Sequence, residues 1–210
     1  MSTGELIEGA KIEIVGTEEH NKHIKIEFTS SKEGDRFKLP EGDYEFRETL
    51  PPEGFVQTTE VGKFSIKDGE ITKAELKNKR IEGTLEFEKT DVSTGEVIEG
   101  AHIKIECVEG FNKGQVIEFV SSAEGNKFEL DYGKYVISET MAPEGFELTT
   151  ETSEFEITED GQIVKAELKN KRIVESLPYT GGTNTNVILG IALTMTLAGV
   201  VMFRYKKATN

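Results

Sequence analysis

The chain has 210 residues, of which 30% are charged, and its net charge of −14 makes it strongly acidic. This charge argues against a nucleic-acid-binding protein, because no basic patch lies outside the last residues of the chain. The single cysteine, Cys107, excludes an internal disulfide, and we interpret it as a small buried residue of a strand.

The first residues carry no export signal. Met1 to Glu5 contain neither a basic start nor an apolar stretch, which are the two recognisable parts of a secretory signal peptide. The other end of the chain, described below, indicates an exported protein. We therefore expect this chain to be the C-terminal portion of a longer protein.

Most of the sequence consists of two copies of one unit. Three segments recur at a nearly constant spacing, and the spacing is 139 − 48 = 91 residues at the second segment. The pairs are STGELIEGAKIEI (2–14) with STGEVIEGAHIKI (93–105), ETLPPEGF (48–55) with ETMAPEGF (139–146), and KAELKNKRI (73–81) with KAELKNKRI (165–173). A repeat of this length is a small domain, so we predict two tandem domains, over residues 1–80 and 81–173.

Both copies have the pattern of an all-β protein. Apolar and polar residues alternate in LEFEK, HIKIE, QVIEFV, KYVIS, EFEIT and KAEL, and clusters of Gly, Asp, Asn, Ser and Pro separate these runs. No segment before Val187 has a helical period. Short strands at this spacing predict a β-sandwich.

Three inward-facing stripes of the second copy each end in a polar residue. Because strand side chains alternate, Lys89 shares a face with Leu85 and Phe87, and Glu139 and Asn170 end two further apolar stripes. A buried unpaired charge is costly. We therefore expect the strands of Lys89 and Asn170 to be neighbours and Glu139 to face them.

Such a trio could react as well as pair. Burial favours the neutral forms of an amine and a carboxyl, and a neutral Lys89 amine is a nucleophile. A protonated Glu139 could polarise the Asn170 carboxamide and transfer protons. Attack on the Asn170 side-chain carbonyl would expel ammonia and leave an isopeptide bond. The alternative is a hydrogen-bonded Lys/Glu/Asn trio with no covalent bond.

These residues stand in motifs that resemble a known family. EKTD (88–91), YVISETMAPEGF (135–146) and ELKNK (167–171) make the second copy similar to the CnaB or SpaA-like, prealbumin-like domains of Gram-positive adhesins and pilins. The resemblance implies Lys89 as nucleophile, Asn170 as acceptor and Glu139 as the catalytic carboxyl of a single intramolecular reaction. It therefore implies no turnover enzyme.

The first copy departs from this pattern. Glu48 and Asn78 match Glu139 and Asn170, but the lysine would lie at 89 − 91 = −2, before Met1. The strand corresponding to LEFEKTD is absent from the chain, so we expect no isopeptide bond here. We expect an incomplete domain with an unpaired edge beside its closing strand.

The sequence offers little support for other chemistry. His20, His23 and His102 do not form a metal-binding set, and no glycine-rich phosphate loop precedes a helix, so we expect neither metal nor cofactor. Glu139 could belong to the carboxylate pair of a hydrolase, but no second carboxylate shares its predicted face.

The C-terminus contains three segments in a characteristic order. Residues 174–186 form a linker with LPYTG (Leu177, Pro178, Tyr179, Thr180, Gly181), residues 187–203 form an apolar run of membrane-spanning length, and residues 204–210 are basic. We expect a transmembrane helix over residues 187–203 and a cytoplasmic tail. A plain anchor helix preceded by a chance LPYTG is the alternative.

This order resembles the cell-wall sorting signal of Gram-positive surface proteins. The resemblance implies that a sortase cleaves between Thr180 and Gly181 and joins Thr180 to a peptidoglycan cross-bridge, so the membrane is only a transient partner. Pro178 favours the extended peptide that an enzyme groove would accept. The implied location is the cell wall.

Together these features predict the structural stalk of a wall-anchored protein, either an adhesin stalk or a basal pilin. A host ligand would then be bound by a region that precedes this chain. The alternative is an adhesin whose CnaB-like domains contact host matrix themselves, although the sequence shows no aromatic or basic patch for such contact.

Overall fold

The computed structural model describes residues 4–68 and 70–174. The LPYTG motif, the expected transmembrane helix over residues 187–203 and the basic tail lie outside the described residues. Within the described ranges the regular structure consists of strands, and none of it is a helix that could cross a membrane.

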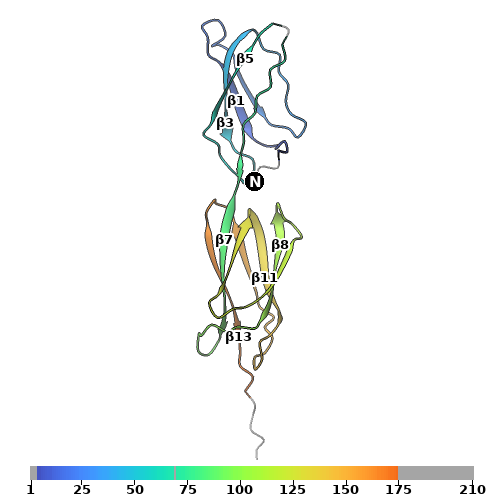
Figure 1. Cartoon of the computed structure of the whole chain (residues 1–210), viewed down its shortest axis with the longest axis vertical. Coiled ribbons are helices and arrows are strands. Elements are labelled where there is room, and N and C mark those ends of the chain that lie inside the picture. The colour runs from blue at the N-terminus through green and yellow to red at the C-terminus, as the bar shows by residue number, and fades with distance from the viewer. Residues whose placement is uncertain (1–3, 69, 175–210) are drawn as a thin grey trace, which may run out of the picture. The chain divides into compact units, whose positions relative to one another are not determined.

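The first domain is built on one antiparallel sheet in the order β2-β1-β3-β5 (Figure 1). A short two-stranded ladder, β4-β6, joins the segment after β3 to the end of the domain. Residues Ala10, Ile12, Ile14, Tyr44 and Phe46 form the buried core of this sheet. The strands are β1 (Lys11–Gly16), β2 (Lys25–Thr29), β3 (Gly42–Leu50), β4 (Phe55–Val56), β5 (Val61–Ile66) and β6 (Lys79–Arg80).

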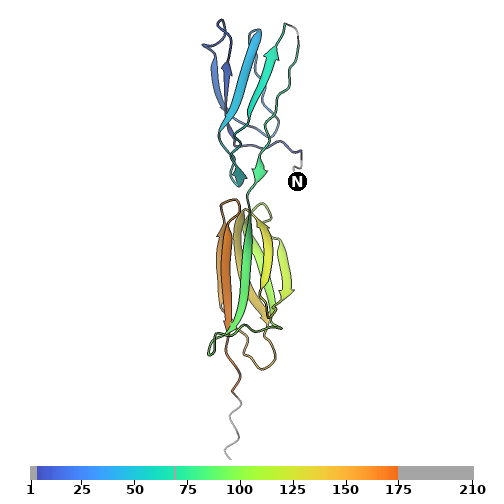
Figure 2. The same cartoon turned by 60° about the vertical axis from the view of Figure 1, so that its left-hand side comes forward.

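The second domain is a sandwich of a three-stranded sheet, β10-β7-β13, and a four-stranded sheet, β12-β11-β8-β9 (Figure 2). All six runs of alternating residues predicted in this copy are strands. The structure contains one further strand, β10, that was not predicted from the sequence. The strands are β7 (Glu82–Asp91), β8 (His102–Gly110), β9 (Val116–Val120), β10 (Asn126–Asp131), β11 (Gly133–Met141), β12 (Thr152–Ile157) and β13 (Ile163–Asn170).

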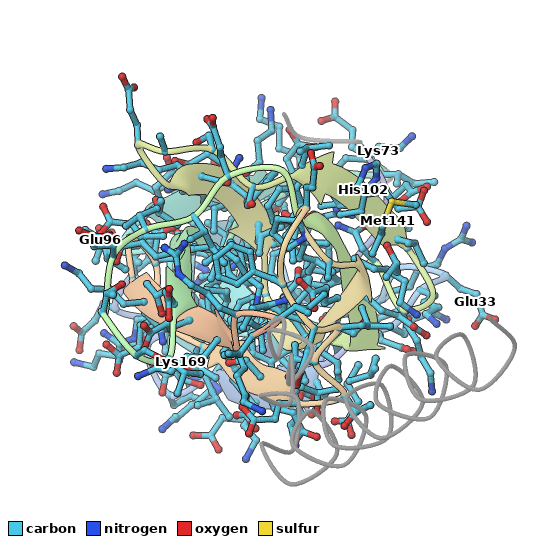
Figure 3. All side chains as sticks on the ribbon, turned by 90° about the horizontal axis from the view of Figure 1, so that it is seen from below. Glu33, Lys73, Glu96, His102, Met141 and Lys169 are labelled. Atoms are coloured by element: carbon cyan, nitrogen blue, oxygen red, sulfur yellow. The ribbon has the colours of Figure 1, made fainter. Side chains whose placement is uncertain are left out.

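The core of the second domain lies between its two sheets. Leu85 and Phe87 of β7 and Ile137 of β11 are at most 1% exposed, and they belong to one cluster of buried residues from both sheets. The outward residues of β7, Thr84, Glu86 and Glu88, are polar. His102 and Met141, which oppose each other across β8 and β11, lie together at the periphery in Figure 3. The predicted all-β sandwich is confirmed.

The first and last strands of the second domain are parallel neighbours. In the β7–β13 ladder, Lys89 lies opposite Leu168 and Asp91 lies opposite Asn170. Parallel strands need a long connection, and here the connection is the rest of the domain. The ends of β7 and β13 therefore meet at the same edge of the sandwich, as Figure 2 shows for the green and orange strands.

The identical segment KAELKNKR has two different structures. In the second domain its first six residues belong to β13, whereas residues 73–78 of the first domain are not a strand. The prediction of a strand at KAEL was therefore wrong for the first copy. A strand needs a hydrogen-bonded neighbour, which is β7 in the second domain. In the described part of the first domain no strand lies beside residues 73–78.

Replacing Ile157 by valine should lower the free energy of unfolding of the second domain by about 0.5–1.5 kcal/mol. Ile157 is fully buried near the start of β11, far along the strands from Glu139. Ile163→Val is the matched control, because Ile163 is 63% exposed. Denaturant unfolding measures both variants, and equal losses would contradict the assigned core.

Candidate functional site

Three buried polar side chains meet at the edge where β7 and β13 end. Lys89, Glu139 and Asn170 come from β7, β11 and β13 and are 1%, 8% and 1% exposed. Lys89 and Asn170 belong to one sheet, and Glu139 faces them from the other. Each position continues an apolar stripe of its strand, so the alternation that fills the core also turns these groups inward. The structure thus brings the predicted trio together.

Glu139 lies between the amine and the carboxamide. Its Oε1 is 3.7 Å from Lys89 Nζ, and its Oε2 accepts a hydrogen bond of 3.0 Å from Asn170 Nδ2. The backbone N–H of Thr149 donates to the same Oε2 at 2.8 Å. Asn170 Nδ2 also donates to the carbonyl oxygen of Glu147 at 2.8 Å, so two acceptors fix the orientation of the amide.

Hydrogen bonding at this site is incomplete. Among the described residues, Lys89 Nζ, Glu139 Oε1 and Asn170 Oδ1 are buried atoms without a hydrogen-bond partner. Buried polar atoms are nearly always paired, so three together at one point require an explanation. An amine, a carboxyl oxygen and a carbonyl oxygen are also the atoms that an amide-forming reaction would use.

Burial changes the proton affinity of the lysine. The loss of solvent lowers the pKa of Lys89, and the charge and hydrogen-bonding capacity of Glu139 oppose this effect, with smaller contributions from Glu151 and Glu167. Desolvation dominates because both side chains of the ion pair are completely shielded from solvent. Lys89 therefore carries a neutral amine more readily than an exposed lysine does.

The first domain repeats the amide cradle, with no lysine in an ion pair with Glu48 among its described residues. Asn78 Nδ2 donates to Glu48 Oε1 and Oε2 at 2.9 and 3.0 Å, and to the carbonyl oxygen of Val56 at 3.1 Å. The N–H of Thr58 donates to Glu48 Oε2 at 2.9 Å. Val56 and Thr58 are the counterparts of Glu147 and Thr149. The cradle therefore forms from the glutamate strand and the loop after it, and it does not depend on a lysine.

Sequence reasoning missed the contributions of Glu147 and Thr149. Both act through their backbone, so the identity of their side chains gave no signal. The segment PEGF recurs directly before these backbone groups in both copies, and this repeat was the sequence signal that could have indicated a shared role for the loop. No cluster of His, Cys, Asp or Glu suited to a metal ion occurs in residues 4–68 and 70–174.

Two protein families match the sequence. Residues 1–80 and 83–172 each match the family described as SpaA, prealbumin-like fold domain. Residues 173–210 match the LPXTG cell wall anchor motif, which indicates sortase processing and covalent attachment to the wall of a Gram-positive bacterium. A search of curated proteins found no match.

Solved structures show the same fold. The Bacillus anthracis TIE protein is 33% identical over 82% of this chain, with a TM-score of 0.69, and this chain covers 32% of that protein. A C-terminal fragment of the pilus adhesin SpaC from Lactobacillus rhamnosus GG is 14% identical, with a TM-score of 0.57, coverage of 85% of this chain and 94% of the fragment. The chain thus spans about a third of the Bacillus anthracis protein.

The sandwich architecture, the recurring glutamate–asparagine contact and the two family matches agree with one another. The chain belongs to the family of the SpaA prealbumin-like fold domain, which it carries in tandem before an LPXTG cell wall anchor motif, as a surface protein of a Gram-positive bacterium.

Proposed function

We propose that this chain is the wall-proximal stalk of a surface protein and that a Lys89–Asn170 isopeptide bond reinforces it. The first domain extends over residues 1–80 and the second over residues 81–173. The observation that carries the proposal is the buried contact of Lys89, Glu139 and Asn170, with three of their polar atoms unpaired. The protein acts once on itself and is not an enzyme.

The reaction requires only groups that the site contains. In the neutral form of the buried pair, the proton resides on Glu139 and the lone pair of Lys89 Nζ is free. This lone pair attacks Cγ of Asn170 and forms the new C–N bond. The attacking nitrogen gives a proton to one oxygen of Glu139, and Glu139 gives a proton to Nδ2 of Asn170. The bond from Cγ to Nδ2 then breaks, ammonia leaves, and Glu139 is restored.

The contacts of Glu139 suit this transfer. Oε1 faces the amine that loses a proton, at 3.7 Å, while Oε2 contacts the leaving nitrogen, at 3.0 Å. One carboxyl group can therefore move protons from the attacking nitrogen to the departing one. The fold holds the reactants side by side, which supplies the high effective concentration that an unreactive amide requires.

The position of the bond suits a load-bearing role. It would join the first strand of the second domain to the last, and these strands are parallel neighbours. A pull on the two ends of the domain acts on the N-terminal end of β7 and the C-terminal end of β13. The covalent bond would bear this load together with the hydrogen bonds of the ladder.

The C-terminal segments would attach this stalk to the wall. Sortase would cleave between Thr180 and Gly181 and transfer Thr180 to an amino group of the peptidoglycan cross-bridge, and the membrane would hold residues 187–203 only until then. A host ligand would be bound by a region outside this chain, in keeping with an adhesin stalk or a basal pilin.

Intact mass spectrometry of the full chain tests the cross-link. The wild-type chain should be lighter than its sequence by one molecule of ammonia, and Lys89→Ala should have the mass of its sequence. Tandem mass spectrometry of a digest should find the peptides of Lys89 and Asn170 joined. A wild-type chain with its full sequence mass would disprove the cross-link, whatever the role of the anchor.

A further inference from the structure

Arg172 connects the segments that follow all three residues of the site. It lies two residues after Asn170, and its Nε donates to Asp91 Oδ2 at 2.5 Å. Its guanidinium lies 5.1 Å from the centre of the Phe146 ring, and Phe146 and Arg172 also form an isolated antiparallel bridge. We refer to Asp91, Phe146 and Arg172 as the clasp.

The Asp91 contact fastens the end of β7 to the end of β13. Asp91 follows Lys89 by two residues, and its side chain is fully shielded from solvent. Its Oδ1 accepts a hydrogen bond of 2.7 Å from the N–H of Ser93, while the N–H of Val92 donates to the carbonyl of Asn170 at 2.9 Å. Arg172 therefore holds a carboxylate that is already fixed by the turn after β7.

The Phe146 contact fastens the loop that forms the amide cradle. Directly after Phe146, the N–H of Glu147 donates to the carbonyl of Lys171 at 2.9 Å. The carbonyl of the same Glu147 accepts from Asn170 Nδ2 at 2.8 Å. An arginine packed on Phe146 thus fixes the loop at the point where it orients the leaving nitrogen. The backbone part of this pairing recurs in the first domain, where Phe55 lies opposite Arg80 in the β4–β6 ladder.

The register of β7 and β13 explains why the contacts of Arg172 matter for the reaction. Asn170 lies opposite Asp91, so the Lys89 side chain must reach diagonally along the strands to the Asn170 amide. A small slide of β7 along β13 would change the distance from Nζ to Cγ. Lys169, which directly precedes Asn170, has a side chain that is 52% exposed and pairs with Glu167, so it lies on the outer face of β13 (Figure 3).

We propose that Arg172 is a positioning residue for formation of the Lys89–Asn170 bond, acting through Asp91 and Phe146. This inference rests on the cross-link proposed above. The Arg172 side chain is 55% exposed, but the Asp91 side chain that it pairs with is fully shielded from solvent, so loss of Arg172 also costs stability by leaving a buried carboxylate without its cation. The rate of cross-linking in Arg172→Ala must therefore be compared with that of a variant that weakens the fold without touching the clasp.

The test is the rate at which newly made chains lose ammonia. The full chain is synthesised in a cell-free reaction, samples are quenched with acid, and intact masses give the cross-linked fraction over time. Arg172→Ala should react roughly 10- to 100-fold more slowly than wild type, because small misplacements of reacting groups cost rates of this size. Arg172→Lys should recover part of the rate, since it keeps a cation and an N–H donor.

Two controls separate positioning from folding and from local charge. Lys171→Ala removes the neighbouring cation, whose Nζ lies 3.5 Å from the exposed carboxylate of Glu147, and should react at the wild-type rate. Ile157→Val weakens the domain core away from the site and should also react at that rate. An Arg172→Ala chain that does not fold is recognised by its circular dichroism, and Arg172→Lys then carries the comparison with wild type.

The outcomes are distinguishable. A wild-type chain that never loses ammonia would disprove the cross-link itself. Cross-linking of wild type and Arg172→Ala at the same rate would overturn the positioning role alone. The same conclusion would follow if Ile157→Val slowed the reaction as much as Arg172→Ala, or if Arg172→Lys recovered none of the lost rate while remaining folded.

Discussion

Glu139→Gln should leave the second domain folded but slow the formation of the Lys89–Asn170 bond by about two to four orders of magnitude. The glutamine carbonyl can still accept the hydrogen bonds from Thr149 and Asn170, which reach Glu139 Oε2 at 2.8 and 3.0 Å. The side chain has nearly the same volume. What is lost is the ability to take a proton from the amine and deliver it to the leaving nitrogen.

This substitution distinguishes two explanations of the reactivity. The carboxylate of Glu139 raises the pKa of Lys89 against the effect of burial, so its removal should leave the amine neutral more often. If a neutral amine were all that the reaction needs, Glu139→Gln would react faster than wild type. Time-resolved intact mass spectrometry measures the rate, and an unchanged or higher rate would contradict proton transfer by Glu139.

The second domain of the cross-linked chain should be about 4–5 kcal/mol more stable than that of the uncross-linked chain, by the loop-closure argument for a cross-link across a long segment. The bond joins Lys89 to Asn170 and so closes nearly the whole domain into one loop. For a domain of this size, the melting temperature of the uncross-linked domain should therefore be roughly 20–30 °C below that of the cross-linked domain.

Glu139→Gln also provides the comparison for stability, because it keeps all three polar side chains at the site. Calorimetry of wild type and Glu139→Gln should show a large difference in the transition of the second domain and little change in that of the first, since Lys89, Glu139 and Asn170 all lie in the second domain. Lys89→Ala should melt in the same range as Glu139→Gln or below it. Equal melting temperatures of wild type and Glu139→Gln, with the bond present by mass in wild type alone, would remove the reinforcing role.

Much of the site could be predicted from residue alternation. Lys89 follows Leu85 and Phe87 on one face of β7, and a strand that buries the first two must also bury the third. The same rule placed Glu139 and Asn170 inside, and the repeat identified Glu48 and Asn78 as counterparts. These predictions needed only local periodicity, which is why they did not depend on knowing how the sheets pack.

Contacts made through the backbone were not predictable in this way. The carbonyl of Glu147 and the N–H of Thr149 orient the amide and the carboxyl, yet any residue type offers the same groups. The clasp was also missed, because Asp91, Phe146 and Arg172 are distant in sequence and meet only when the ends of β7 and β13 come together. Strand β10 was missed although its Phe128 and Leu130 alternate with charged residues.

The sequence by itself determined the all-β class, the two repeats, the wall-anchor motif and the inward direction of the reactive side chains, since these follow from periodicity and motif. The tertiary structure alone decided whether a segment becomes a strand. In the second domain the first six residues of KAELKNKR belong to the closing strand β13, whereas in the first domain the same six residues, 73–78, form no strand. The physical reason is that strand hydrogen bonds need a partner: β7 lies beside the second copy, and no strand lies beside the first within the described residues.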